Sequence, residues 1–270
     1  MRLVSLAFAL SLVGVTGCHA PAASLEPALS LGAEELDHAT AQFKRGCDGG
    51  DPHACLQLGL AYAHGRGVRR NFGKAAAMYE RACEGGVADG CSNLGGLYAR
   101  GQGVRQSDRR AAALFGRACA GASEQGCYNL GFMFAQGRGV EADDGKAVMF
   151  YQVACDAGLA ESCANLGLMI AAGRGVDRDD ARAVELYQRA CTAGALAGCD
   201  NLGFMIASGR GVGQDDARAA ALFRDACDRG NAAGCYNLAM MYRQGRAVPI
   251  LPAEPPPSAA EDLTGVVSKR

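Results

Sequence analysis

Residues 155–176 read CDAGLAESCANLGLMIAAGRGV, and residues 191–212 read CTAGALAGCDNLGFMIASGRGV. The second stretch repeats the first after 36 residues, with Cys, Asn-Leu-Gly and Gly-Arg-Gly-Val in the same places. Extended along the chain, this register gives two series of equally spaced cysteines: Cys47, Cys83, Cys119, Cys155, Cys191 and Cys227, and Cys55, Cys91, Cys127, Cys163, Cys199 and Cys235. A fixed period of this length predicts a solenoid built from two-helix units.

The second cysteine of each pair, taken as position 0, marks the first helix of a repeat. Leucine at position 3, glycine at position 4 and an aromatic or aliphatic residue at position 7 lie on the same helical face as this cysteine. Glycine inside a helix costs about 1 kcal/mol relative to alanine, so its recurrence predicts that a neighbouring helix crosses there at close range. The Gly-Arg-Gly-Val motif then ends the first helix.

A second helix is predicted after a short polar loop, and it ends at the next first-series cysteine. The predicted N-caps, whose side-chain oxygens accept from free backbone N–H groups, are Asn71, Asp108, Asp144, Asp180 and Asp216. Glycine turns the chain into the next unit, except at Ala122, where Gly121 is the expected substitute. The motif arginines are interpreted as solvated loop charges, with an anion site as the alternative: Arg66, Arg138, Arg174 and Arg210.

The N-terminus resembles a bacterial lipoprotein signal peptide. Met1-Arg2 precedes an apolar run, Leu3–Val15, which is too short to span a bilayer and ends in Val15-Thr16-Gly17-Cys18. We predict a signal peptide over 1–17 and lipidation of Cys18, which would anchor an exported protein to a membrane of the bacterial envelope. An ordinary signal peptide with a chance cysteine is the alternative.

The rest of the chain divides into three predicted segments. Residues 18–33 are a tether, residues 34–247 are the solenoid, and the proline-rich residues 248–270 are a disordered tail. Within the solenoid, a helix at about 34–48 is an unpaired helix of the second type that caps the stack. Charge is balanced, at a formal −1, and no basic stripe is present, so nucleic-acid binding is not expected.

The repeating residues resemble a known family. Cys-x-Asn-Leu-Gly, Gly-x-Gly-Val and a Lys/Arg-Ala helix ending in Ala-Cys are similar to the Sel1-like repeat, and the added Cys-x7-Cys pair is similar to its cysteine-rich exported, Hcp-type subgroup. This resemblance implies an all-α fold, an α/α superhelix related to tetratricopeptide repeats.

Two disulfide pairings are geometrically possible, across the short turn or within one helical hairpin. The turn pairing uses all twelve cysteines of the two series, whereas the hairpin pairing leaves Cys47 and Cys235 unpaired. Counting favours the turn pairing, which the family resemblance also implies: Cys47–Cys55, Cys83–Cys91, Cys119–Cys127, Cys155–Cys163, Cys191–Cys199 and Cys227–Cys235. Zinc-type Cys-x2–4-Cys spacing does not occur, so neither a metal nor another cofactor is predicted.

The opposite face of the first helices is the candidate ligand groove. Amides at position 2 can bond an extended peptide backbone, and methionines at position 6, beside Phe or Leu at position 5, add an adaptable apolar strip. The candidate residues are Gln57, Asn93, Asn129, Asn165, Asn201, Asn237, Met133, Met169, Met205 and Met241. The alternative is structural, with the amides bracing adjacent repeats and the methionines in the core between them.

The sequence therefore predicts a protein- or peptide-binding scaffold. The subgroup resemblance implies an alternative, β-lactam binding or weak β-lactamase activity. No serine has a lysine three residues on, and Lys-Thr-Gly is absent. Hydrolase activity would therefore rest on the resemblance alone, and no catalytic residue is assigned.

Overall fold

The computed structural model describes residues 33–246, which form α-helices and no strand, as the all-α prediction requires. The helices are α1 (Ala33–Asp48), α2 (Pro52–His64), α3 (Phe72–Glu84), α4 (Ala88–Arg100), α5 (Asp108–Ala120), α6 (Glu124–Gln136), α7 (Asp144–Asp156), α8 (Ala160–Ala172), α9 (Asp180–Thr192), α10 (Leu196–Ser208), α11 (Asp216–Asp228) and α12 (Ala232–Arg243). The predicted signal peptide, Cys18, nearly all of the tether and the proline-rich tail lie outside the described residues.

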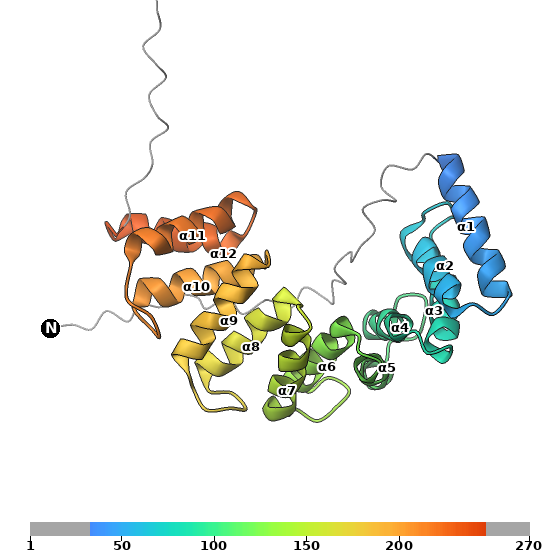
Figure 1. Cartoon of the computed structure of the whole chain (residues 1–270), viewed down its shortest axis with the longest axis horizontal. Helices are drawn as coiled ribbons and strands as arrows, with labels where there is room; N and C mark the ends of the chain where they lie inside the picture. The colour runs from blue at the N-terminus through green and yellow to red at the C-terminus, as the bar shows by residue number, and fades with distance from the viewer. Residues whose placement is uncertain (1–32, 247–270) are drawn as a thin grey trace, which may run out of the picture.

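The helices stack in chain order into a curved arch, with α1 at one end and α11 and α12 at the other (Figure 1). Even-numbered helices are the first helices of their repeats, and odd-numbered helices are the second. First helices of adjacent repeats also touch, as α4 touches α6 and α8 touches α10. The predicted superhelical solenoid is therefore confirmed. No helix within residues 33–246 is both long and apolar enough to cross a bilayer.

Four of the five predicted N-caps lie one residue too late in the sequence. The second helices of those repeats begin one residue earlier than predicted. Asn71 is confirmed, because its side chain accepts from the Lys74 N–H. The other caps are Ser107, Asp143, Asp179 and Asp215. A cap needs an extended backbone, which these residues have. The predicted caps Asp108, Asp144, Asp180 and Asp216 are instead the first helical residues.

The turn at Ala122 also differs from expectation. Ala122 itself takes the left-handed conformation, with φ 64°, whereas Gly121 has φ −86°. The prediction that Gly121 replaces the missing glycine is therefore wrong. A glycine occupies the equivalent place in the other turns, as at Gly158, where a Cβ would meet nothing within 4 Å. Because the site is open, Ala122 bears only the conformational cost of a positive φ.

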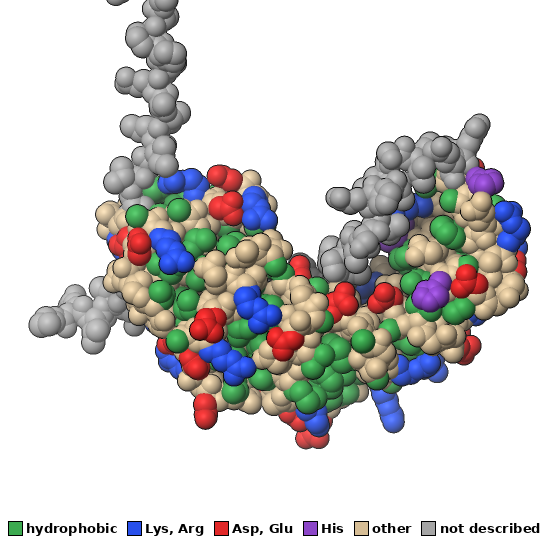
Figure 2. All heavy atoms as spheres, in the orientation of Figure 1, with side chains coloured by type: hydrophobic (Ala, Val, Ile, Leu, Met, Phe, Trp, Pro, Cys, Tyr) green, Lys and Arg blue, Asp and Glu red, His purple; other side chains and the backbone are tan. Residues whose placement is uncertain are grey.

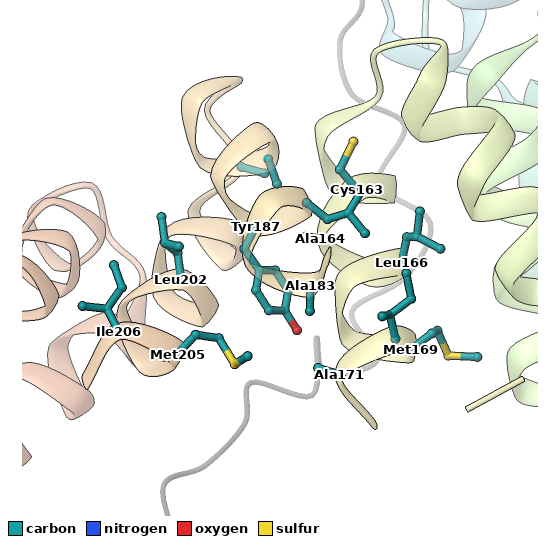
Figure 3. Close-up of a cluster of buried hydrophobic side chains, with 14 of the residues drawn as sticks. Cys163, Ala164, Leu166, Met169, Ala171, Ala183, Tyr187, Leu202, Met205 and Ile206 are labelled. Carbon is teal, nitrogen blue, oxygen red and sulfur yellow. The ribbon is translucent and has the colours of Figure 1, made fainter. Parts of the chain in front are cut away.

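In the core, an aromatic ring of each complete second helix packs against a glycine of the first helix in the same repeat. Tyr187 of α9 lies between Leu166 of α8 and Leu202 of α10, and all three are almost fully buried (Figure 3). A Cβ on Gly167 would lie 2.7 Å from Cε1 of Tyr187. The same contact recurs between position 4 and the ring of the second helix in the other complete repeats. This confirms the predicted close crossing and lets small residues such as Ala183 fill the remaining space.

Six disulfide bonds close the turns between successive repeats. They join Cys47–Cys55, Cys83–Cys91, Cys119–Cys127, Cys155–Cys163, Cys191–Cys199 and Cys227–Cys235. The Cα atoms of each pair lie 4.4–4.7 Å apart, within the range that disulfides require. The turn pairing is confirmed, and each bond ties the end of a second helix to the start of the next first helix.

Three of the four loop arginines, Arg138, Arg174 and Arg210, join neighbouring repeats, so their interpretation as solvated charges is wrong. The interpretation of Arg66 as a solvated charge stays a prediction. Arg210 bonds Asp180 of the preceding repeat at 2.7 Å, and it also donates to the carbonyl of Ala171. Equivalent ion pairs join Arg138 to Asp108, Arg174 to Asp144 and Arg246 to Asp216. Each arginine thus ties together both helices of the repeat before it, which is why those aspartates stand at the first helical position.

The sequence contains a signal for these arginine–aspartate pairs. Gln102 replaces the arginine where Phe72 replaces the aspartate 30 residues earlier, and Arg66 has Leu36 at that distance. The signal is the spacing of 30 residues between an arginine in one repeat and an aspartate in the preceding repeat. It cannot be found when each helix is considered separately.

Asp180 makes the solenoid sensitive to acid. Hydrogen bonds from Arg178 and Arg210 lower the pKa of Asp180 to about 2. Because the pKa falls on folding, the ion pair stabilises the fold above the unfolded value, near pH 4, and loses this effect as pH falls towards 2. Since Arg178 is largely exposed, we expect only about 1 kcal/mol from this site. Asp180→Asn should lower the free energy of unfolding by that amount at pH 7.

Chemical denaturation at pH 7 and at about pH 2.5 measures this effect. The difference between Asp180→Asn and the parent protein should shrink at the lower pH, because the carboxyl is then largely protonated in the unfolded chain and partly protonated in the folded one. Asp177→Asn, an equal charge change at an exposed position in the same loop, is the control. A difference that is independent of pH would contradict the assignment.

Candidate functional site

The inner face of the arch is formed by the first helices. In Figure 1, α4 and α6 lie towards the hollow of the arch, while α5 and α7 lie towards its outer side. The space-filling view shows the same open hollow between the two ends (Figure 2). On α8 the inward stripe consists of Glu161, Asn165, Leu168 and Ala172, spaced by four, three and four residues. We call the surface formed by this stripe and its equivalents in the other repeats the inner groove.

An apolar row runs through the inner groove at position 5. Its members are all half-buried: Leu60, Phe132, Leu168, Phe204 and Met240. The row is interrupted at Gly96, where the guanidinium of Arg100 lies so close that a Cβ would be 3.3 Å from it. Exposed polar side chains flank the row, such as Glu161 at one end of the α8 stripe and Gln136 at the end of α6. Partly exposed apolar groups between polar flanks are typical of surfaces that bind other chains.

The predicted amide ladder is only partly accessible. Asn129, Asn201 and Asn237 are buried, at 4%, 2% and 1% exposure, so they do not line an open surface. Gln57, Asn93 and Asn165 are half-buried and remain candidates for ligand contact.

Two of the asparagines brace adjacent repeats, as in the structural alternative. The amide nitrogen of Asn165 donates to the Tyr128 hydroxyl at 3.4 Å, and that of Asn237 donates to Asp200 at 2.8 Å. The partner in each case stands 37 residues earlier, at position 1 of the preceding repeat. These position 1 partners were not predicted from the sequence, although a polar residue beside a buried cysteine, Tyr128 or Asp200, is a signal for them.

The predicted methionine strip is wrong. Met133, Met169, Met205 and Met241 are at most 3% exposed and belong to the core. Figure 3 shows Met169 and Met205 among the buried side chains of α8 and α10. The reason is geometric, because a first helix contacts its own second helix and the helices of both neighbouring repeats. Its buried face is therefore wider than the single stripe of a helix that packs on one side only.

Buried tyrosine hydroxyls of the second helices lie beneath the groove. Burial raises the pKa of Tyr151 above its usual value, and the nearby Tyr128 adds to the shift. The ring of Tyr151 packs 5.8 Å from that of Tyr128. Burial likewise raises the pKa of Tyr187. These phenols therefore stay protonated over the physiological range. Tyr151 shares a hydrogen bond with Asn165, whereas Tyr187 serves packing alone.

A shallow hollow of about 420 Å³ lies at the loop between α2 and α3. Its lining includes Arg69, Arg70 and Lys74. The ammonium of Lys74 stands over the ring of Tyr62, and the guanidinium of Arg70 stands over the ring of Phe72. Because these cations already pack on aromatic rings, we do not assign a ligand to this hollow. Within residues 33–246 no cluster of His, Cys, Asp or Glu has the arrangement of a metal site.

Comparison with known proteins identifies the repeat. A family model described as the Sel1 repeat matches six consecutive stretches, at residues 52–87, 88–123, 125–159, 160–194, 196–231 and 232–252. None of the curated proteins compared with the sequence matches it.

Two solved structures have the same architecture, and a third is similar over part of this chain. A Sel1 repeat protein from Oxalobacter formigenes is 25% identical, with a TM-score of 0.75 over 82% of this chain and 88% of the other. The protein c5321, a protective antigen of uropathogenic Escherichia coli with an SLR fold, is 29% identical, with a TM-score of 0.71 over 82% of this chain. This chain spans about half the length of that antigen, at 51%. Helicobacter pylori cysteine-rich protein B is 27% identical over 51% of this chain, with a TM-score of 0.42.

Proposed function

We propose that this chain, which belongs to the Sel1 repeat family, is an exported scaffold that holds an extended segment of another protein in its inner groove. Sel1 repeats generally mediate protein–protein interaction. The apolar row at position 5 is the observation that carries the proposal. It supplies half-buried apolar contacts in every repeat except that of Gly96, while the flanking polar side chains can bond a peptide backbone.

The six disulfides indicate an exported protein, because such bonds persist in oxidising compartments. They use twelve of the thirteen cysteines and leave Cys18. That cysteine follows a short apolar run, so we propose that residues 1–17 are a lipoprotein signal and that a lipid on Cys18 anchors the scaffold to a membrane of the bacterial envelope. Residues 18–33 would then link the lipid to the solenoid.

Leu168→Glu tests the groove. Leu168 is half-buried on the inward stripe of α8, so a carboxylate there should repel the apolar side chains of a bound peptide. Linear peptides selected for binding from a random display library serve as the probe, with affinities measured by fluorescence anisotropy. We expect the variant to bind them at least about tenfold more weakly, a change of about 1.4 kcal/mol.

Ala221→Glu is the matched control, because it adds the same charge on the outer side of α11, at the position where α9 already has Glu185. Its peptide affinities should equal those of the parent protein. Equal losses in both variants, or none in Leu168→Glu, would place the binding surface elsewhere. The parent protein is also assayed with a chromogenic cephalosporin, and turnover above the buffer rate would favour the β-lactam alternative.

A further inference from the structure

The outer face of α7 differs from that of every other second helix in the described residues. At two outward positions, α3, α5, α9 and α11 have Ala or Glu followed by Arg or Asp, whereas α7 has Met149 and Val153. These two side chains are 51% and 48% exposed. In the space-filling view, hydrophobic side chains gather on the outer side of the arch near α6 and α7 (Figure 2). One repeat in the middle of the array thus has an apolar outer surface.

Val153 also lacks a contact that other repeats make. The arginines at this position donate to the carbonyl of the cysteine 34 residues earlier, as Arg117 does to Cys83 and Arg189 does to Cys155. Valine has no such donor, and its exposed surface is unfavourable in water by about 25 cal/mol per Å². The pair Met149 and Val153 is therefore disadvantageous in an isolated chain and advantageous where another surface covers it.

Charged residues flank this pair in a symmetric pattern. Lys146, Met149, Val153 and Asp156 follow one another at intervals of three, four and three residues, which puts them on one stripe of α7. The lysine and the aspartate lie equally far from the middle of the stripe and have opposite charges. Their side chains are 56% and 58% exposed. When the stripe is reversed, each charge meets its opposite and Met149 meets Val153.

We propose that two copies of this chain associate through antiparallel α7 helices related by a two-fold axis. Met149 then packs on the partner's Val153, and Lys146 pairs with the partner's Asp156. A two-fold interface needs a surface complementary to itself, and this stripe has that property. A second copy is therefore the occupant to which the pattern points.

The charged residues are free to exchange their present neighbours. Lys146 lies 3.1 Å from Asp143 and stands 5.3 Å from the centre of the Phe134 ring. Asp156 lies 3.6 Å from Arg189 and accepts an exposed hydrogen bond from Gln152 at 2.8 Å. Exposed pairs of this kind contribute about 0–1 kcal/mol. A single 13-residue helix on the outer side of the arch buries less than the roughly 1,600 Å² of a standard interface. The dimer should therefore be weak, and its population should rise with protein concentration.

Sedimentation velocity of the chain from residue 18 onward, with Cys18→Ser to prevent lipid and thiol linkage, tests this at concentrations up to about 0.5 mM. The weight-average mass should rise towards that of a dimer. The variant Met149→Ala/Val153→Arg takes the residues that other repeats use at these positions, so it should keep the parent's unfolding temperature and weaken association at least about tenfold. A monomer at every concentration, or unchanged association in this variant, would overturn the proposal.

A charge swap tests the antiparallel geometry. Lys146→Asp alone and Asp156→Lys alone place like charges opposite each other twice per dimer, so each should weaken association about fivefold. The double variant Lys146→Asp/Asp156→Lys restores opposite charges and should return association to near the parent level. A double variant as weak as the single ones would exclude this pairing of α7 helices.

Discussion

Reduction of the six disulfides is expected to unfold the solenoid at room temperature. Each bond spans a sequence separation of 8, and closing so short a loop stabilises a fold by about 2–3 kcal/mol in the chain-entropy model. Six such bonds together contribute about 12–18 kcal/mol in this model, which equals or exceeds the whole stability of a typical domain, about 5–15 kcal/mol. The core between them is poor in large side chains, since several fully buried positions are alanines such as Ala147 and Ala183.

Circular dichroism at 222 nm during titration with a phosphine reductant follows this loss. Selective removal gives a graded check. Cys155→Ala/Cys163→Ala deletes a bond whose cysteines are 0% and 4% exposed, so it should lower the free energy of unfolding by at least the entropic 2–3 kcal/mol and by a further term for the lost sulfur packing. Cys227→Ala/Cys235→Ala, at the half-exposed terminal joint, should cost less. A reduced protein that keeps its helical signal would contradict the assigned role of the disulfides.

The second large effect is expected from Gly175→Ala. Gly175 has φ +70°, and a Cβ there would lie 2.3 Å from the carbonyl carbon of Asp144 in the preceding repeat. Alanine therefore meets an unfavourable backbone conformation and a clash with another backbone, which no side-chain rotation relieves. We expect a loss of about 3 kcal/mol or more in the free energy of unfolding, measured by urea denaturation.

Gly158→Ala separates the two causes. Gly158 also has a positive φ, +101°, but a Cβ there would meet nothing within 4 Å, and Ala122 occupies the equivalent turn in another repeat. This control should lose only about 1 kcal/mol. Equal losses at the two glycines would mean that backbone conformation alone, and not the contact between repeats, accounts for the effect.

The repeat period, the helix pairs and the cysteine pairing followed from the sequence because each is encoded by local spacing. An interval of eight residues between cysteines across a short turn restricts which sulfurs can meet. Likewise, glycine at position 4 signalled a close helix crossing. Four N-caps were predicted one residue too late because two adjacent polar residues, such as Asp179 and Asp180, both suit a helix start. The structure assigns the first to capping and the second to Arg210.

The division between groove and core was decided only by the stacking of repeats. Met169 and Leu168 are neighbours in the sequence and are both apolar, yet one is in the core and the other lines the inner groove. The sequence alone determined a disulfide-linked helical repeat, since period and composition are properties of one unit. The tertiary structure determined which side chains remain accessible, because each helix is partly buried by the repeats 36 residues before and after it. The rotation between successive repeats decides which face is buried, and the sequence of one repeat does not specify that rotation.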